Sequence, residues 1–427
     1  MPKLNTIFLV TLSALFVKSQ PIPREWQLFK LDLSLYPNAL CLDGSPGAFY
    51  LLPGVGEGAS DFVAHQNGGG WCVSLDDCRK RAFEGPVYAN QPSLGSSLNW
   101  GPGPCTPELA NSTLPCVADG GSGGILSSNQ TINPSFWQAT KVWFGYCSGD
   151  SFAGALTEPL PVNSTHSVYF RGDAIMKATL ETLATNHGLA RATSFILKGC
   201  SAGGVATYFQ ADAVKDIISR LAPNARYAAL PGAGVFLEYP SYAGPNLDDA
   251  VFKWIFYAAN MSYTGNTACT SDLGSDFAWK CLYAVTLFKY IQTPMFIANS
   301  LTDAASQEFI MNLPCSLADG TCNAQELAYV DAFSETMAAN VSSILMAPGS
   351  PHGAFLLTCS VHMIENIDGA VSLIHVKGRT LSEVFSSWWN KTPDEKYYAI
   401  DDVWSKGNGK NGGNPDCHFY GPVPSVP

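Results

Sequence analysis

A serine lies at the centre of a short glycine-rich motif, because residues 199–203 read Gly-Cys-Ser-Ala-Gly and so have the form G-x-S-x-G. The apolar run Ser194–Lys198 before it is typical of a strand, and the four-residue apolar spacing of Val205–Leu221 after it is typical of a helix. A serine in a tight turn between a strand and a helix exposes its hydroxyl at the positive end of the helix dipole. The alternative is a structural turn that happens to contain a hydroxyl. The order of elements favours Ser201 as a nucleophile, with the Ala202 N–H as one donor to an oxyanion.

A serine hydroxyl is a weak nucleophile at neutral pH, so it needs a base, and the base needs a group that orients it. With a nucleophile of this kind, the acid follows the serine along the chain and the histidine follows the acid. Asp303 comes shortly after an apolar run that begins at Pro294, so we expect it in a loop at the carboxyl end of a strand. An Asx turn or a helix N-cap is the more common role for such an aspartate, and that alternative stays open here.

Four histidines follow this acid candidate: His352, His362, His375 and His418. His375 lies in an apparent strand and His418 in the glycine-rich tail, so neither is expected to be the base. His352 has a loop context, Gly-Ser-Pro-His-Gly, and the pattern alone narrowly favours it. His362 follows Cys359 by three residues, so a disulfide could fix its backbone. Each of these histidines could instead be structural.

A second oxyanion donor is expected from a glycine-rich loop after an early strand. The segment 68–71 reads Gly-Gly-Gly-Trp and directly follows the predicted strand at 61–66. Glycines let backbone N–H groups approach a substrate oxygen closely. A flexible turn is the alternative, but the position between a strand and Cys72 favours the oxyanion role.

The composition indicates a large folded chain of the secretory pathway. The 427 residues are 46% hydrophobic and 14% charged, with a net charge of −11 and no basic run that would suggest nucleic-acid binding. Residues 1–19 have the pattern of a signal peptide, because a lysine precedes a short apolar run and a small residue precedes the expected cleavage site. No other segment reaches membrane-spanning length, so we expect a secreted protein that is not membrane-held.

Cysteines and glycosylation motifs support this expectation. The 13 cysteines predict a disulfide framework with one thiol left over, for which Cys200 is the candidate. Cys72 with Cys78 and Cys315 with Cys322 are close enough to close local loops, and we predict a Cys72–Cys78 disulfide. Paired C-x-x-C motifs are missing and the seven histidines do not cluster, so a zinc site is not expected. Asn-x-Ser/Thr motifs begin at Asn111, Asn129, Asn163, Asn260, Asn340 and Asn390.

Strands alternate with helices along the chain, which predicts a mainly parallel, doubly wound α/β sheet with helices on both faces. Residues 91–135 are rich in Gly, Pro, Ser and Asn and contain Cys105 and Cys116, so we expect a disulfide-tied loop insertion there. Further along, 327–346 is expected to be helical with a strand-like end, 371–376 a strand, and 381–389 a closing helix. No linker separates two domains, so residues 20–427 are predicted to form one domain.

Taken together, these residues resemble the pectin acetylesterase family, which includes the secreted Notum carboxylesterases. The resemblance covers most of the sequence after the signal peptide and depends on seven motifs that occur in family order. The motifs are Leu42-Asp-Gly-Ser-Pro with Ala48-Phe-Tyr, Asn67-Gly-Gly-Gly-Trp-Cys72, Tyr146-Cys-Ser-Gly-Asp-Ser-Phe152, Phe170-Arg-Gly172, Gly199-Cys-Ser-Ala-Gly-Gly204, Asn299-Ser-Leu-Thr-Asp303 and Cys359-Ser-Val-His362.

The resemblance implies an α/β-hydrolase-like fold and a catalytic triad of Ser201, Asp303 and His362. The base of this family follows a cysteine by three residues, so the resemblance selects His362 over His352. By the same resemblance, the oxyanion donors are backbone N–H groups. These donors fall on Gly69, Gly70 and Ala202.

The chain departs from the family pattern at three places. Asn67 stands where the family usually has Glu, and Ser148 and Asp150 are exchanged relative to plant-type members. The stretch Pro231-Gly-Ala stands where plant-type members carry an Asp. These changes leave the triad intact and bear on the substrate.

The implied reaction is hydrolysis of O-acetyl esters on a polysaccharide such as pectin, by a monomer outside the cell or in the cell wall, with no cofactor. One alternative is a Notum-like deacylase that removes a fatty acyl group from a protein and needs a deep apolar pocket. Another is a glycan-binding pseudoenzyme with Trp71, Trp100 and Trp137 as stacking platforms. The intact triad argues against the pseudoenzyme.

Overall fold

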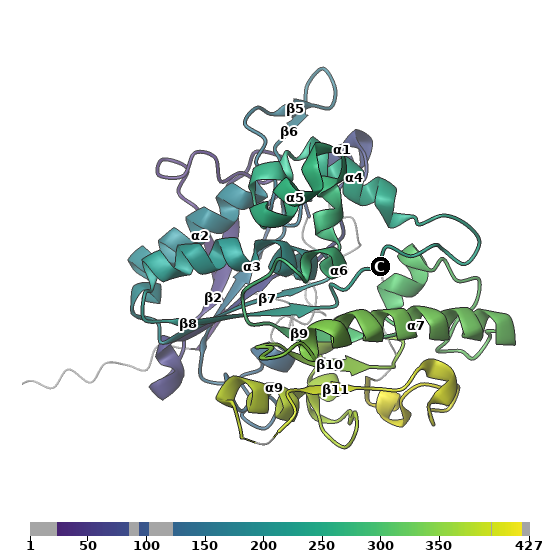
Figure 1. The fold of residues 1–427 in the computed structure, drawn as a ribbon. Helices are drawn as coiled ribbons and strands as arrows, with labels where there is room; N and C mark the ends of the chain where they lie inside the picture. The colour runs from purple at the N-terminus through teal and green to yellow at the C-terminus, as the bar shows by residue number, and fades with distance from the viewer. Residues whose placement is uncertain (1–23, 85–93, 102–122, 394, 421–427) are drawn as a thin grey trace, which may run out of the picture.

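The structure is a computed structural model that describes residues 24–84, 94–101, 123–393 and 395–420. The expected signal peptide (1–19), most of the expected insertion, and its cysteines Cys105 and Cys116 lie outside these ranges. The described chain folds around one large sheet with helices on both faces (Figure 1).

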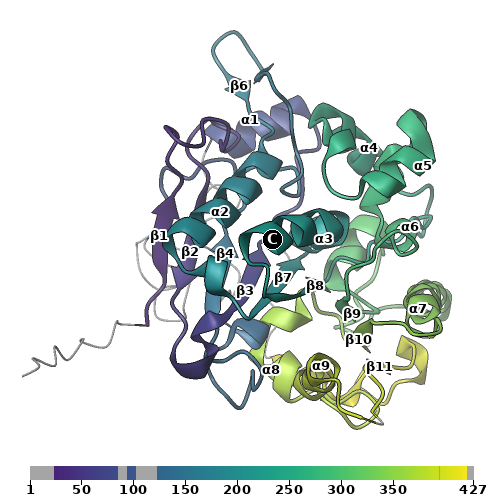
Figure 2. The same cartoon turned by 60° about the vertical axis from the view of Figure 1, so that its left-hand side comes forward.

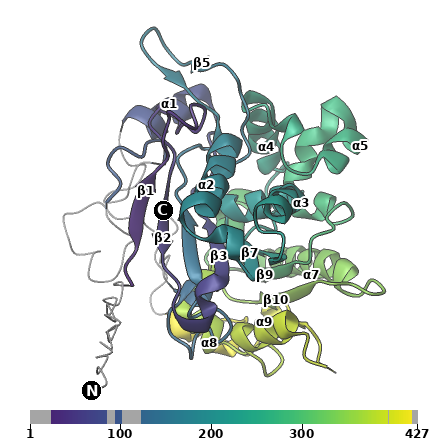
Figure 3. The ribbon, with the colours of Figure 1, turned by 90° about the vertical axis from the view of Figure 1, so that its left-hand side faces the viewer.

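Nine strands form the sheet in the order β1-β2-β4-β3-β7-β8-β9-β10-β11, and a separate hairpin pairs β5 with β6. The strands are β1 Gln27–Lys30, β2 Ala48–Leu52, β3 Asp61–Gln66, β4 Thr140–Phe144, β5 Leu160–Pro161, β6 Ser167–Val168, β7 Ser194–Cys200, β8 Arg226–Gly232, β9 Phe296–Ser300, β10 Gly353–Leu357 and β11 Tyr398–Ile400. Strands β1, β2 and β4 pair antiparallel, and every pair from β4 to β11 is parallel. Figure 3 shows β1 and β2, in purple, at one side of the molecule. The mainly parallel sheet confirms the predicted fold class.

The helices lie in layers on the two faces of this sheet. They are α1 Leu75–Phe83, α2 Gly172–Asn186, α3 Ala202–Leu221, α4 Asp248–Ala258, α5 Thr267–Phe277, α6 Ala284–Leu287, α7 Ala324–Leu345, α8 Asp368–Ser372 and α9 Leu381–Asn390. Figure 2 shows α2 and α3 on one side of the sheet and α8 and α9 on the other. In β9, the Phe296 ring packs on Trp388 of α9, while Asn299 Nδ2 contacts Met337 Sδ of α7 at 3.6 Å. Residues three apart in a strand face opposite sides, so α7 and α9 cover opposite faces.

Burial on both faces of the sheet explains why the central strands are mostly apolar. Every residue of β2, β4, β7, β9 and β10 is buried. Parallel strands covered on both faces are continuous apolar runs rather than alternating ones. Buried polar residues in these strands therefore stand out, and Lys141 and Lys198 are both fully buried.

Several expectations for the C-terminal third are wrong. Residues 371–376 are not a strand but the end of α8 and the loop after it, and the expected strand-like end of 327–346 is helical as far as Leu345. The sequence analysis missed β10 and β11 altogether. Apolar runs of three to six residues are too short for periodicity to separate strand from helix, and here tertiary packing decides. The closing helix is confirmed as α9.

Four disulfides join described cysteines: Cys41–Cys147, Cys269–Cys281, Cys315–Cys322 and Cys359–Cys417. The Cys315–Cys322 disulfide agrees with expectation, and Cys200 lies outside the disulfides, as expected. The expected Cys72–Cys78 disulfide is wrong, because both residues are buried thiols. Burial, and then a hydrogen bond with Cys78, raise the pKa of the Cys72 thiol well above its ordinary value. This shift disfavours the thiolate that disulfide formation requires.

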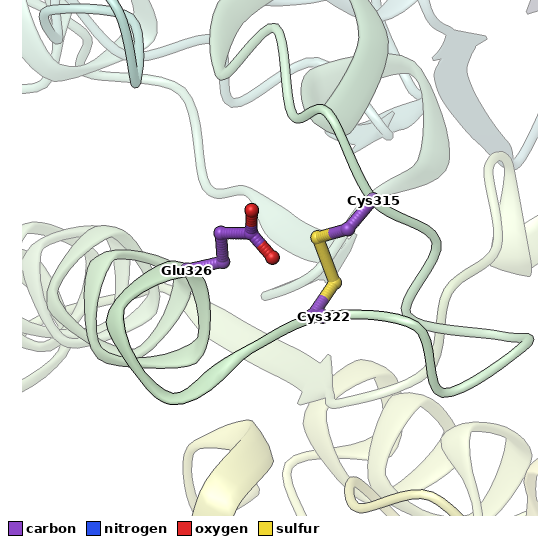
Figure 4. A group of neighbouring side chains, drawn as sticks. All are labelled: Cys315, Cys322 and Glu326. Atoms are coloured by element: carbon purple, nitrogen blue, oxygen red, sulfur yellow. A yellow bond between two sulfur atoms is a disulfide. The ribbon is translucent and has the colours of Figure 1, made fainter.

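One group of side chains near the start of α7 has the composition of a metal site. Sulfur atoms of Cys315 and Cys322 and a carboxylate oxygen of Glu326 lie within 4.8 Å of one another (Figure 4). The two sulfurs are bonded to each other and offer no thiolate. The Glu326 carboxylate accepts a hydrogen bond of 2.8 Å from the Asn323 N–H and completes a capping box. This group is therefore the N-terminal cap of α7 with a disulfide beside it.

In the described ranges, no helix combines the length and the apolar character needed to cross a bilayer. Asn129, Asn163 and Asn390 are exposed, and Asn260 and Asn340 are partly exposed. All five described glycosylation motifs are therefore accessible at the surface, and Asn111 lies outside the described residues.

Candidate active site

Ser201 occupies a strained turn between β7 and α3. Its backbone angles are φ 55° and ψ −126°, a region that residues with a Cβ rarely adopt. A Cβ on Gly199 would lie 2.1 Å from the Gly203 carbonyl oxygen, and one on Gly203 would lie 2.0 Å from the Gln66 oxygen. Only glycine therefore permits this close approach of strand, turn and helix. The predicted strand–turn–helix around Ser201 is confirmed, with the hydroxyl at the N-terminus of a 20-residue helix.

Asp303 and His362 form a buried hydrogen-bonded pair. Asp303 Oδ2 lies 2.7 Å from His362 Nδ1, and the two side chains are 2% and 9% exposed. The other carboxylate oxygen, Oδ1, accepts the Ser306 N–H at 3.0 Å. Asp303 thus also has the N-cap-like role that the sequence left open. The two roles use different oxygens and fix the carboxylate from both sides.

The loop that carries His362 follows β10 and is anchored at several points. Cys359 is bonded to Cys417, and its carbonyl oxygen accepts the Ser300 hydroxyl at 2.5 Å. Gln307 Nε2, from the segment after Asp303, donates to Ser360 Oγ at 2.9 Å. The expected disulfide next to this histidine is confirmed, and it holds the backbone of the loop.

The sheet topology brings these three side chains to one edge. Ser201, Asp303 and His362 follow the carboxyl ends of β7, β9 and β10, which lie close together in the sheet and run parallel (Figure 1). In open parallel sheets, this edge is where reactive groups gather. The Ser201 N–H donates to the Gly232 carbonyl oxygen at 3.2 Å. A Cβ added to Gly232 would lie 2.3 Å from the carboxylate oxygens of Glu365, which follows His362 by three residues. The Glu365 carboxylate therefore lies against the same glycine that accepts the Ser201 N–H.

His352 lies at the other edge of the sheet. It precedes the first residue of β10, and its Nδ1 accepts the Met295 N–H at 3.2 Å. Burial lowers the pKa of its imidazole. The choice of His352 from the pattern alone is therefore wrong, because β10 separates this residue from the edge at which Ser201 lies.

The glycine loop after β3 lies against the serine. A Cβ on Gly68 would lie 2.7 Å from Ser201 Cβ, so this position must be glycine for the two segments to touch. Gly69 and Gly70 have positive φ values of 138° and 64°. In the part of the chain that the structure describes, the backbone N–H groups of Gly69, Gly70 and Ala202 donate to no backbone acceptor. These are the groups expected to bind an oxyanion.

The motif 146–152 supplies structural contacts that the sequence analysis did not assign. The Tyr146 hydroxyl donates to the Gly70 carbonyl oxygen at 2.7 Å, and Ser151 Oγ donates to the Ala202 carbonyl oxygen at 2.7 Å. Arg81 of α1 donates from Nη1 to the Gly69 carbonyl oxygen at 2.8 Å. Tyr146 and Ser151 belong to one of the seven family motifs. Nothing in the sequence distinguishes Arg81, which lies in an ordinary amphipathic helix.

Ser148 and Asp150, the two exchanged residues, interact through their side chains. Ser148 Oγ donates to Asp150 Oδ1 at 2.5 Å, and the Gly172 N–H donates to Oδ2 at 3.1 Å. Both residues are fully buried, and burial raises the pKa of the Asp150 carboxyl to about 7. Within the described structure, Asp150 therefore has a structural role beneath the site.

Three comparisons place the chain among known proteins. The family model described as "Pectinacetylesterase" matches residues 25–410. Pectin acetylesterase 11 of Arabidopsis thaliana is 26% identical over 364 residues, which is 83% of each chain. The palmitoleoyl-protein carboxylesterase NOTUM of Mus musculus is 26% identical over 285 residues, which is 65% of this chain and 50% of that one.

The fold also has a counterpart of known structure. The Wnt deacylase Notum from Drosophila superposes with a TM-score of 0.70 at 22% sequence identity, covering 88% of this chain and 96% of that one. This likeness confirms the α/β-hydrolase-like fold. With the family model matched over nearly the whole length, the chain belongs to the pectinacetylesterase family.

Proposed function

We propose that this protein is a serine carboxylic ester hydrolase that removes O-acetyl groups from an extracellular polysaccharide such as pectin. One observation carries the proposal: the buried 2.7 Å contact between Asp303 and His362, at the edge of the sheet where Ser201 occupies its strained turn. Family membership and the similarity to pectin acetylesterase 11 support the ester substrate.

In the proposed mechanism, Ser201 Oγ attacks the acetyl carbonyl carbon while His362 Nε2 takes the hydroxyl proton. Asp303 accepts the hydrogen bond of Nδ1–H, which fixes the tautomer and stabilises the imidazolium. The developing oxyanion is bound by backbone N–H groups of Gly69, Gly70 and Ala202.

Collapse of this intermediate breaks the ester bond. His362 returns its proton to the sugar oxygen, and the sugar alcohol leaves. Water, deprotonated by His362, then attacks the acetyl-enzyme. His362 returns this proton to Ser201, and acetic acid leaves and ionises to acetate in solution. His362 carries each proton that is transferred within the site, and the proposal includes no cofactor.

The proposed setting is outside the cell or in the cell wall, with the protein as a monomer. Four disulfides among the described cysteines support an oxidising compartment. The accessible Asn-x-Ser/Thr motifs support passage through the secretory pathway.

A second candidate is a deacylase that removes a longer acyl group, and the similarity to the palmitoleoyl-protein carboxylesterase NOTUM favours it. The Trp71 ring packs edge-on against Phe236 at 5.5 Å and Phe252 at 5.0 Å. All three rings are buried, at 8%, 4% and 0% exposed, so a long acyl chain could reach them only if they moved apart. The same burial weakens the glycan-binding pseudoenzyme, because Trp71 and Trp100 are only 8% and 7% exposed and offer little face for stacking a sugar.

Hydrolysis of 4-nitrophenyl esters from acetate to octanoate, followed by acetate release from acetylated pectin and acetylated xylan, tests the proposal. We expect kcat/KM to be highest for the acetate ester and pectin to release acetate. A preference for octanoate would favour the deacylase. Ser201→Ala should abolish both turnover and labelling by a fluorophosphonate probe, and activity that survives this substitution would refute the mechanism.

A further inference from the structure

The glycine loop at 68–70 is held by side chains through its carbonyl oxygens. Arg81 Nη1 donates to the Gly69 oxygen at 2.8 Å, and Tyr146 Oη donates to the Gly70 oxygen at 2.7 Å. Both side chains are buried, at 8% and 1% exposed. Two consecutive carbonyls of one short loop are thus fixed from the protein interior.

Fixing a carbonyl also fixes the N–H group that shares its peptide plane. A peptide unit is planar and trans, so the C=O and the following N–H point in opposite directions. The Arg81 contact with the Gly69 oxygen therefore directs the Gly70 N–H away from the guanidinium. Tyr146 holds the next peptide plane, whose N–H belongs to Trp71, and so fixes Gly70 from its other side. A rotation of the first plane would turn the Gly69 carbonyl, and not the Gly70 N–H, toward a bound oxyanion.

The glycine loop needs restraint from other residues, because glycines restrict their own backbone conformation very little. Gly69 and Gly70 sit at φ 138° and 64°, and glycine reaches many other conformations at small cost. A hydrogen-bond donor contributes to catalysis in proportion to how well it is preorganised. The restraint must therefore come from the groups that contact the loop.

Both restraining side chains are themselves anchored. Arg81 Nε donates to Asp77 Oδ2 at 3.1 Å, one turn earlier on α1. Tyr146 Oη accepts the Ser151 N–H at 3.0 Å, and Ser151 Oγ in turn donates to the Ala202 carbonyl oxygen at 2.7 Å. The glycine loop and the first turn of α3 therefore belong to one hydrogen-bonded network.

We propose that Arg81 and Tyr146 are positioning residues for the oxyanion-binding N–H of Gly70, because they hold the peptide planes on its two sides through the carbonyl oxygens of Gly69 and Gly70. Neither residue touches the substrate in this role. The inference rests on the proposed esterase function, and it adds two side chains from separate elements, α1 and the loop after β4, to the machinery of that reaction.

The test compares Tyr146→Phe with a matched control, Tyr50→Phe. Tyr50 is also a fully buried tyrosine whose hydroxyl donates to a backbone carbonyl, that of Gly101, at 2.9 Å. Each substitution removes one hydroxyl. Tyr50→Phe loses one hydrogen bond to backbone, and Tyr146→Phe loses two, the one to the Gly70 oxygen and the one from the Ser151 N–H. We expect Tyr146→Phe to lower kcat for 4-nitrophenyl acetate by about 10- to 100-fold, a part of the loss seen when a whole donor is deleted. KM should stay within about twofold, because the contact matters in the transition state.

A second readout separates positioning from a general loss of structure. Affinity for a trifluoromethyl ketone, which forms a tetrahedral oxyanion on Ser201, should fall for Tyr146→Phe in proportion to kcat/KM. Tyr50→Phe should keep both values although it also loses a buried hydrogen bond and some thermal stability. Arg81→Lys keeps the charge but cannot reach Asp77 and the Gly69 oxygen with one planar fork, so it should resemble Tyr146→Phe.

The possible outcomes distinguish failure of the positioning role from failure of the proposed esterase function. Wild-type kcat and ketone affinity in Tyr146→Phe would overturn the positioning role while leaving the esterase proposal standing. A fall in kcat with unchanged ketone affinity would overturn the role as well. A wild-type protein that neither hydrolyses the ester nor reacts with fluorophosphonate would overturn the proposed function, and the positioning role with it.

Discussion

Lys198 and Glu365 form an ion pair inside the protein, with Nζ 3.5 Å from Oε1 and both side chains completely buried. Lys198 lies on β7, three residues before Ser201, and Glu365 lies three residues after His362. Burial lowers the pKa of Lys198 and raises that of Glu365, while the charge of each partner acts against these shifts. The pair therefore joins the strand that carries the serine to the loop that carries the histidine.

We predict that Glu365→Gln strongly destabilises the protein. The substitution leaves the Lys198 charge buried, with His65 Nδ1 at 3.1 Å and Asn366 Oδ1 as its remaining contacts. Removing one partner of a buried ion pair costs about 3–5 kcal/mol. Urea unfolding followed by tryptophan fluorescence measures the change in the free energy of unfolding.

The double variant Lys198→Met/Glu365→Leu is the control for this prediction. It removes both charges, so it should recover much of the stability that the single variant loses. A single variant as stable as the wild type would show that the pair contributes nothing to the fold.

We predict that Gly68→Ala lowers kcat by about 100-fold or more while the protein still folds. An added Cβ would lie 2.7 Å from Ser201 Cβ and 2.8 Å from the Cys200 carbonyl oxygen, so the glycine loop or the nucleophile must move. Displacement of about 1 Å at a catalytic group can cost roughly 100-fold in rate. Steady-state hydrolysis of 4-nitrophenyl acetate and circular dichroism of the folded protein give the two measurements.

Gly244→Ala is a suitable comparison for Gly68→Ala. Its added Cβ would have no neighbour closer than 3.8 Å, and it lies in an exposed loop. We expect this variant to keep wild-type turnover. Equal activity in the two alanine variants would contradict the close contact of loop and serine.

We predict opposite outcomes for the two histidines that the sequence left open. His362→Ala removes the partner of Asp303 and should lower kcat by about 10⁴-fold or more. His352→Ala removes only an acceptor for the Met295 N–H at the far end of β10, so kcat should stay near the wild-type value with a small loss of stability. Turnover and melting temperature of the two variants check this, and the reverse result would reject His362 as the base.

The histidines also show what the sequence could and could not predict. The turn around Ser201 and the loop position of Asp303 follow local rules of strand, turn and helix, and both were predicted correctly. The choice between His352 and His362 depends on β10, a five-residue run that no periodicity identifies. His352 lies before the first residue of β10 and His362 lies after its last. Because the sequence pattern did not reveal this strand, it could not show which histidine lies at the same edge of the sheet as Ser201. Only the family resemblance selected His362.

Two residues that act through other residues, Arg81 and Glu365, could not be identified from the sequence. Arg81 is one of several charged residues on an amphipathic helix, and its contact with Gly69 depends on how α1 packs against the loop after β3. Glu365 meets Lys198 across 167 positions of sequence. The expected Cys72–Cys78 disulfide failed for a related reason, since short spacing permits a bond but the surroundings of the thiols decide their state.

The last prediction concerns pH and Asp150. Its folded-state pKa is raised to about 7 by burial, against an ordinary value of 3.8. Between these two values, the folded protein holds a proton that the unfolded chain has lost, so this group's contribution to stability falls as the pH rises from about 4 to about 7. Asp150→Asn carries no titrating proton, and its amide can still accept the Gly172 N–H and donate to Ser148 Oγ.

We therefore expect the free energy of unfolding of Asp150→Asn, relative to that of the wild type, to increase between pH 4 and pH 8. The increase has an upper bound of about 4 kcal/mol, from a shift of roughly three pKa units. Urea unfolding of both proteins across this range measures it. In a matched control, Asp32→Asn, the substituted carboxyl is exposed and hydrogen bonds with Ser34 lower its pKa, so the difference from wild type should stay level above pH 5. A flat difference for Asp150→Asn as well would show that this carboxyl is ionised in the folded protein, with Ser148 and Gly172 stabilising its negative charge beneath the site.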